Sequence, residues 1–221
     1  MSPEAVTAER IHRELKRLLC TGRFAPGLPL TVQSLANEFG TSISPVRDAL
    51  NRLVGERLIN VQGGGGFAMP FLSRRTAFNL YSWHAEITLL IIKVMVTFEP
   101  VGDPPEEIVG VRADPSIIES ATAELFTRLA ACSPNPEHQE AINSVADRLA
   151  RFRLHEGAIT KQGGELLTLW NIAQSGNRSA TRTAMMQYHR KRLMRVDEIS
   201  AAASRMIDLP PPSGPIGLLV D

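Results

Sequence analysis

The side chains best suited to reading a nucleic-acid sequence lie together in residues 42–47, which read Ser-Ile-Ser-Pro-Val-Arg. Arg47 carries a charged, planar group that can donate two hydrogen bonds to guanine, a contact that discriminates against a wrong base by about 1–3 kcal/mol. Ser42 and Ser44 can donate to phosphate oxygens, together with the free amides at the start of a helix. The segment therefore predicts a helix that enters the major groove of DNA.

Two features beside this segment bear on the same chemistry. Asp48 is unfavourable near phosphate as an isolated charge, and it is tolerable there if it orients Arg47 or Arg52 by ion pairing. Further on, four consecutive glycines at residues 63–66 join two short apolar runs. Because glycine has no Cβ, the backbone of such a hairpin tip can approach the sugar-phosphate edge of DNA closely.

The elements that must hold these side chains are three short helices and a β-hairpin. Capping residues, prolines and glycines bound the expected helices, which cover residues 2–21, 31–39 and the stretch from Ser42 or Ser44 to Gly55. In the third helix a buried stripe is expected at helical spacing: Val46, Ala49, Leu50 and Leu53. Strands are expected at 58–61 and 67–69. This order is the plan of a winged helix-turn-helix.

The rest of the chain favours an all-helical arrangement. Residues 74–98 are rich in Ile, Val and Leu, so a strand is one alternative for this segment. Its length favours a buried helix instead. Prolines and acids make 99–115 a solvated loop. Further helices are expected at 116–132, 137–155, 164–175 and 178–203. The fold class is therefore mainly α, with a winged helix-turn-helix domain at 1–73, an all-helical domain at 74–205, for which ligand binding and dimerisation follow from the resemblances given below, and an extended tail at 206–221.

The N-terminal motifs resemble those of the GntR family of bacterial regulators. The resemblance covers residues 8 to 70, with Gly-Arg-Phe-Ala-Pro-Gly at 22–27, Pro-Val-Arg-Asp-Ala-Leu at 45–50 and Glu-Arg-Leu-Ile at 56–59. It implies a homodimer that binds a palindromic operator on double-stranded DNA. It also implies that the protein is a repressor whose DNA binding is controlled by a small-molecule effector. Two departures remove charge: Ile43 stands where many members have arginine, and Gln62 with the glycines replaces a basic wing.

Together, the residues and the resemblance give one set of expected DNA contacts. They lie on the second helix, on the third helix and on the wing: Gln33, Ser42, Ile43, Ser44, Pro45, Arg47, Arg52, Gly64, Gly65 and Gly66. With so few cations, readout should rest on Arg47, the hydroxyls and apolar contact with thymine methyls.

A second, looser resemblance links the C-terminal half to the helical ligand-binding domain of FadR-type regulators, in a shortened form. Such domains often bind a divalent metal through one aspartate and three histidines. The stretch at 165–168, where the first histidine is expected, has none. His155 and His189, with Asp147, are the remaining candidate ligands. We expect no cofactor and no metal site, and the effector-binding residues are unknown.

Two other groups in this half have alternative interpretations. Six cations between residues 178 and 195 form either an anion-binding or partner-binding face, or a solvated helix paired with the acids at 99–107. The group comprises Arg178, Arg182, Arg190, Lys191, Arg192 and Arg195. Four aromatic residues line an apolar pocket or belong to an ordinary core: Tyr81, Trp83, Phe126 and Trp170.

Composition limits the remaining classes. The net charge of +1 over 221 residues means that any nucleic-acid footprint must be local. Cys20 and Cys132 are expected to be thiols, although a single disulfide stays open. The charged N-terminus predicts no signal peptide, so we expect a cytoplasmic protein that joins the nucleoid when it binds DNA, with no membrane partner. We find no catalytic motif in the sequence, so we expect that the protein is not an enzyme. The alternative function is a degenerate winged-helix adaptor that acts through protein partners and binds DNA weakly.

Overall fold

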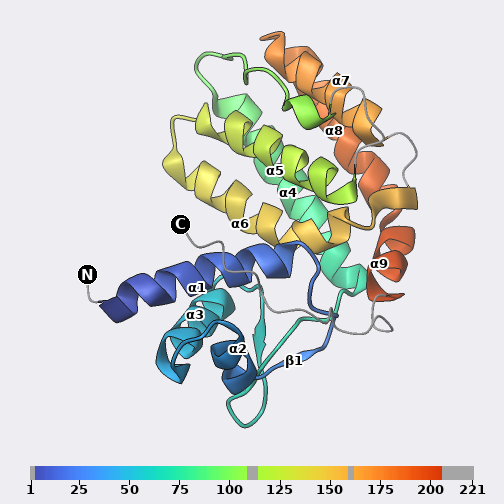
Figure 1. The fold of residues 1–221 in the computed structure, drawn as a ribbon. Helices are drawn as coiled ribbons and strands as arrows, with labels where there is room; N and C mark the ends of the chain where they lie inside the picture. The colour runs from blue at the N-terminus through green and yellow to red at the C-terminus, as the bar shows by residue number, and fades with distance from the viewer. Residues whose placement is uncertain (1–2, 109–113, 159–161, 206–221) are drawn as a thin grey trace. The chain divides into compact units, whose positions relative to one another are not determined.

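The computed structural model describes residues 3–108, 114–158 and 162–205. The chain forms two compact units, one up to Phe71 and one from Leu72 to Ala203. The fold is mainly helical, with one small sheet (Figure 1). The expected fold class, a winged helix-turn-helix followed by a helical unit, is confirmed.

The first unit contains three helices and a three-stranded sheet. Its elements are α1 (Pro3–Cys20), β1 (Pro29–Leu30), α2 (Val32–Glu38), α3 (Ile43–Gly55), β2 (Asn60–Val61) and β3 (Phe67–Ala68). The strands lie in the order β1-β3-β2, and both pairs are antiparallel. Strand β1 was not expected from the sequence. A two-residue strand has no periodicity of its own, and it forms only because Ala68, far along the chain, pairs with Pro29.

The apolar stripe predicted for α3 is the centre of the first unit's core. Val46, Ala49, Leu50 and Leu53 are fully buried, because they recur on one face of the helix. They form one cluster with residues of α1, such as Leu15. Burying this face of α3 leaves the opposite face to solvent, so the core fixes which side chains the helix can offer to a ligand.

The second unit is built from six α-helices and two short 3₁₀ turns within the described residues. They are α4 (Arg74–Val94), η1 (Glu106–Ile108), α5 (Pro115–Ala131), α6 (Pro136–Arg153), η2 (Glu156–Ala158), α7 (Gln162–Gln174), α8 (Arg178–Met194) and α9 (Val196–Ser204). The helix alternative for residues 74–98 is correct, although α4 ends at Val94. The single helix expected at 178–203 is wrong, because Arg195 separates α8 from α9. The expected tail at 206–221 lies outside the described residues.

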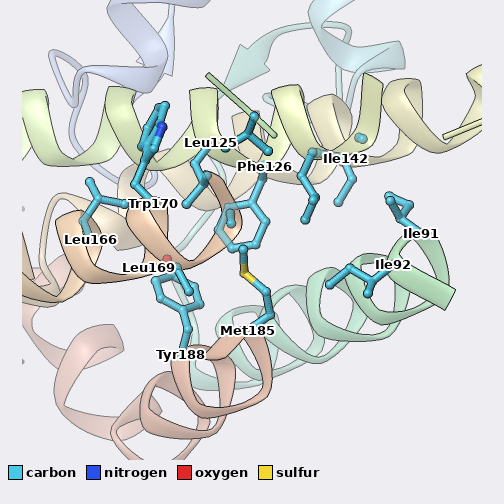
Figure 2. Packing of buried hydrophobic residues seen from close by; sticks show 14 of the residues in the cluster. Ile91, Ile92, Leu125, Phe126, Ile142, Leu166, Leu169, Trp170, Met185 and Tyr188 are labelled. Carbon is cyan, nitrogen blue, oxygen red and sulfur yellow. The ribbon is translucent and has the colours of Figure 1, made fainter. Parts of the chain in front are cut away.

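Side-chain caps and a shared apolar core hold these helices in place. Ser73, Asp114, Asn135 and Asn177 each accept a hydrogen bond from a backbone amide in the first turn of the helix that follows. Within the unit, α4 packs against α6 and α8, and α5 packs against α6. Figure 2 shows Phe126, Met185 and Tyr188 pointing toward one another inside this core.

Candidate nucleic-acid interface

The first turn of α3 presents its polar face to solvent. Ser42 occupies the N-cap position, and its side chain makes no capping hydrogen bond, so the hydroxyl is available to a ligand. Ser44 is exposed, and the side chain of Ile43 is 42% exposed. Arg47, one turn further along, is exposed and has no hydrogen bond or ion pair with any residue that the structure describes. These four side chains therefore form an open surface with one free cation.

Pro45 does not belong to this surface. It was expected among the DNA contacts, but its side chain is buried with the core-facing residues of α3. A proline in the first helical turn has a preset φ and lacks the amide hydrogen that would otherwise need a partner. Its role is to start the helix, and that leaves the contacts to its neighbours.

Arg52 is committed to a partner within the first unit. Its Nη1 donates to Glu9 Oε2 of α1 at 2.6 Å, and this hydrogen bond lowers the pKa of the Glu9 carboxyl. Among the described residues Asp48 pairs with neither Arg47 nor Arg52, and Arg52 pairs with Glu9 instead. This hydrogen bond uses one of the five N–H donors of Arg52, whose side chain is 47% exposed.

Gln33 and the glycine tip are both exposed, as a contact surface requires. Gln33 lies in the first turn of α2, and its Nε2 donates to Asn37 Oδ1 at 3.1 Å. At the tip, Gly64 and Gly65 have φ angles of 98° and 83°, a region that other residues rarely adopt. No atom lies near the place where a Cβ of either glycine would stand. The tip is therefore a narrow backbone loop open to a partner.

A contact that the sequence analysis missed fixes the far end of α3. His12 of α1 donates from Nε2 to Glu56 Oε1 at 2.6 Å, just after the last turn of α3. The two residues lie 44 positions apart, so no local pattern could have indicated the pair. Together with Arg52 and Glu9, it joins α1 to α3 by polar contacts outside the core.

The histidines of the second unit do not fit a metal centre. His189 Nδ1 lies 2.7 Å from the carbonyl oxygen of Met185, which can only accept, so Nδ1 carries the proton. Nε2 of neutral His189 must then accept from His84 Nδ1, at 2.7 Å. His84 Nε2 in turn accepts from Arg153 Nη2, at 3.2 Å. Both nitrogens of His189 are occupied, which removes it as a ligand.

This chain of hydrogen bonds keeps both imidazoles neutral. Burial lowers the pKa of His189 to about 3 and lowers that of His84 well below its usual range. The other candidate, His155, is half-buried, and burial also lowers its pKa. Among the described residues no three histidine, cysteine or carboxylate side chains are grouped to hold a metal ion. Both cysteines are free thiols.

The six cations at residues 178–195 do not act as one face. Arg178 donates to the carbonyl oxygen of Met95 at 2.6 Å, at the end of α4. Lys191 and Arg192 pair with Glu165, and Arg192 also pairs with buried Glu156 at 2.9 Å. Arg195 pairs with Glu198. None of these acids belongs to 99–107, so that expectation is wrong, and Arg182 and Arg190 have no partner in the described chain.

The four aromatic residues separate in the same way. Tyr81, Phe126 and Trp170 are buried in the core, and Trp83 is half-exposed on α4. The ordinary-core interpretation is therefore correct for three of them.

No helix among the described residues is long and apolar enough to cross a membrane.

Residues 7–69 match the family model described as bacterial regulatory proteins of the gntR family. The regulator McbR of Escherichia coli K12 is 31% identical over 87 residues, which is 39% of this chain and 39% of McbR. The repressor GlaR of the same organism is 26% identical over 85 residues, 38% of this chain and 39% of GlaR. The chain thus covers about two-fifths of the length of each of these relatives.

Solved structures extend the likeness to the fold of both units. The structure of E. coli McbR/YncC has a TM-score of 0.59 at 18% identity and covers 90% of this chain and 99% of that one. A protein of Rhodococcus sp. RHA1, described as a GntR transcriptional regulator, has a TM-score of 0.64 at 15% identity and covers 86% and 96%. At such identities the likeness concerns the fold alone.

Proposed function

We propose that the chain, whose residues 7–69 match the model of the gntR family of bacterial regulatory proteins, is a sequence-specific regulator of transcription that binds double-stranded DNA. The observation that carries the proposal is the exposed first turn of α3, where Arg47 stands without a partner while the opposite face of the helix is buried. A helix with one exposed polar face and one face packed into the core can enter the major groove while the core holds it rigidly.

We further propose that the protein acts as a homodimer on a palindromic operator. Each first unit offers one free arginine, two hydroxyls and the Ile43 side chain to base edges and phosphates. A single set of this size gives weak discrimination, and a two-fold arrangement doubles it over two half-sites. Repression is the favoured sense of regulation, supported by the description of GlaR as a repressor. The second unit supplies dimerisation and an effector site, and the protein acts in the cytoplasm.

The test replaces Arg47. Arg47→Ala should weaken binding to the operator by about 1–3 kcal/mol, roughly five- to 150-fold, because one bidentate base contact is lost. Fluorescence anisotropy with labelled promoter fragments, with unrelated DNA as competitor, measures this. Arg13→Ala, an exposed arginine of α1, is the matched control. Equal losses for both variants would show that Arg47 contributes only general charge.

The second candidate function is a protein adaptor with the same fold. The ion pair between Arg52 and Glu9 favours it, because that pair and the uncharged wing leave few cations for phosphate. An adaptor should bind all DNA sequences with similar, weak affinity, whereas a regulator should prefer its operator by about 10³-fold or more. Measuring both affinities at two salt concentrations separates the functions, since phosphate contacts set the salt dependence.

A further inference from the structure

Asp48 lies at the centre of the exposed face of α3. The buried residues of the helix, such as Val46, Ala49 and Leu50, define its core-facing side. At about 100° per residue, Asp48 projects from the opposite side, together with Ser44 four positions earlier. Asp48 is exposed, and it makes no ion pair with any residue that the structure describes. The helix therefore presents an unpaired carboxylate on the face that the core leaves to solvent.

The other acids of the first unit differ from Asp48 in this respect. Four of them lie 2.6 to 3.1 Å from the charged group of an arginine or a lysine, namely Glu9, Glu14, Glu38 and Glu56. Asp48 also has a cation at a suitable spacing, since Arg52 lies four positions later on the same helix. Glu9 of α1 binds that arginine instead. The fold thus pairs these four acids and leaves Asp48 without a cation.

The helix itself gives Asp48 no compensating interaction. An acid in the first turn of a helix is stabilised by the positive end of the helix dipole, but the first turn of α3 contains no acid. Asp48 lies in the second turn, and alanine has a higher helix propensity than aspartate at such a position. Contacts within the described chain therefore give no reason for an aspartate here, whereas contact with a ligand does.

One DNA base suits an unpaired carboxylate in the major groove. Cytosine presents its N4 amino group there, and this group donates a hydrogen bond to the carboxylate of aspartate or glutamate. The other bases present acceptor atoms, such as N7 and O6 of guanine and O4 of thymine, which repel a carboxylate. The phosphates repel it as well. An unpaired aspartate on this face therefore weakens binding to DNA wherever no cytosine offsets the repulsion.

We propose that Asp48 is a specificity-determining residue that accepts a hydrogen bond from the N4 amino group of a cytosine in the operator. The proposal rests on the proposed function, because it requires α3 to lie in the major groove. Arg47, the free cation one position earlier, contacts a guanine at a separate base pair of the same site. Arg47 attracts the correct sequence and Asp48 rejects the others, so specificity comes from a repulsive element as well as an attractive one.

Selection of binding sites from a randomised DNA duplex library, with the full chain, tests this assignment. The unmodified protein should select a cytosine at one fixed position, and Asp48→Ala should lose that preference while it keeps the guanine that Arg47 contacts. Asp48→Asn should select adenine at that position, because an amide can donate to N7 and accept from N6. In fluorescence anisotropy, replacing the cytosine should weaken binding of the unmodified protein roughly five- to 150-fold and binding of Asp48→Ala less than about twofold.

Affinity for unrelated DNA should change in the opposite direction. Asp48→Ala should bind a duplex that lacks the selected site about two- to fivefold more tightly, because an exposed repulsive charge is removed. Its thermal unfolding midpoint should not fall, since the side chain is exposed and alanine favours the helix. Glu86→Gln, which removes an exposed acid of α4 in the second unit, is the matched control. It should change neither the selected sequence nor the affinity.

Two results would overturn the assignment alone. If Asp48→Ala selects the same sequence as the unmodified protein and binds all DNA more tightly, Asp48 is only a surface charge. If Asp48→Ala loses the guanine instead of the cytosine, Asp48 orients Arg47 in the complex and contacts no base itself. An unmodified protein that enriches no sequence from the library would refute the proposed function and the assignment with it, so the two kinds of failure are distinguishable.

Discussion

Lowering the pH should destabilise the second unit through its buried histidine pair. Burial lowers the pKa of His189 from 6.5 to about 3 in the folded protein, and it lowers the pKa of His84 in the same direction. Below pH 6.5 the unfolded chain binds a proton at each imidazole, while the folded chain does not. The free energy of unfolding therefore has its full value above about pH 6.5 and decreases as the pH falls toward 3.

The size of the effect follows from the separation of the two pKa values. One pH unit below the unfolded pKa corresponds to about 1.36 kcal/mol for a group that stays neutral when folded. At pH 5, which is 1.5 units below 6.5, His189 alone should cost about 2 kcal/mol relative to pH 8. His84 acts in the same direction. Burial raises the pKa of Glu119, which acts in the opposite direction and is present in every variant compared below.

Urea unfolding followed by tryptophan fluorescence measures this, because both tryptophans, Trp83 and Trp170, lie in the second unit. His189→Gln removes the titration and keeps an oxygen that can accept from His84. Between pH 8 and pH 5 the unmodified protein should lose about 2 kcal/mol more than this variant. His138→Gln, a control on α6 outside the pair, should behave like the unmodified protein. Equal losses in all three proteins would refute the reasoning.

Four further substitutions, two in each unit, test how the units are held together. Arg192→Met should destabilise the second unit by about 3–5 kcal/mol, because it leaves buried Glu156 without its cation, whereas Glu165→Gln, at the more exposed partner, should cost less than about 1 kcal/mol. Tryptophan fluorescence during urea unfolding measures both, and similar costs would contradict the difference in burial. Gly27→Ala and Gly40→Ala should each cost about 1–2 kcal/mol in the first unit, measured by circular dichroism, because both glycines have positive φ. A Cβ at Gly27 would also meet the ring of Phe71, which is 71% exposed, so we expect the ring to move aside at little cost. A much larger loss of stability for Gly27→Ala than for Gly40→Ala would contradict this expectation.

Local patterns in the sequence were sufficient for the helices of the first unit, α3 included, but not for the two-residue strand β1. The spacing of Val46, Ala49, Leu50 and Leu53 predicts which face of α3 is buried, and that face leaves Arg47 and the two serines outside. Helix periodicity and capping act over a few residues, so one sequence displays them. Pro45 shows the limit, because its residue type indicates a helix start and leaves open whether its side chain is inside or outside.

Contacts between distant residues were decided only by the tertiary structure. Arg52 was expected on DNA, but Glu9, 43 positions earlier, holds it. His189 was a candidate metal ligand, but the carbonyl oxygen of Met185 holds its Nδ1, and His84, 105 positions earlier, occupies its Nε2. The cation run on α8 was one motif in the sequence, and packing divided it into neutralised members and the free Arg182 and Arg190. The sequence alone indicated most of the helices, their buried faces and the exposed polar segment at 42–47, because these depend on neighbours in the chain. The availability of each charged side chain to a ligand depends on which helices the fold brings together, and only the tertiary structure decides that.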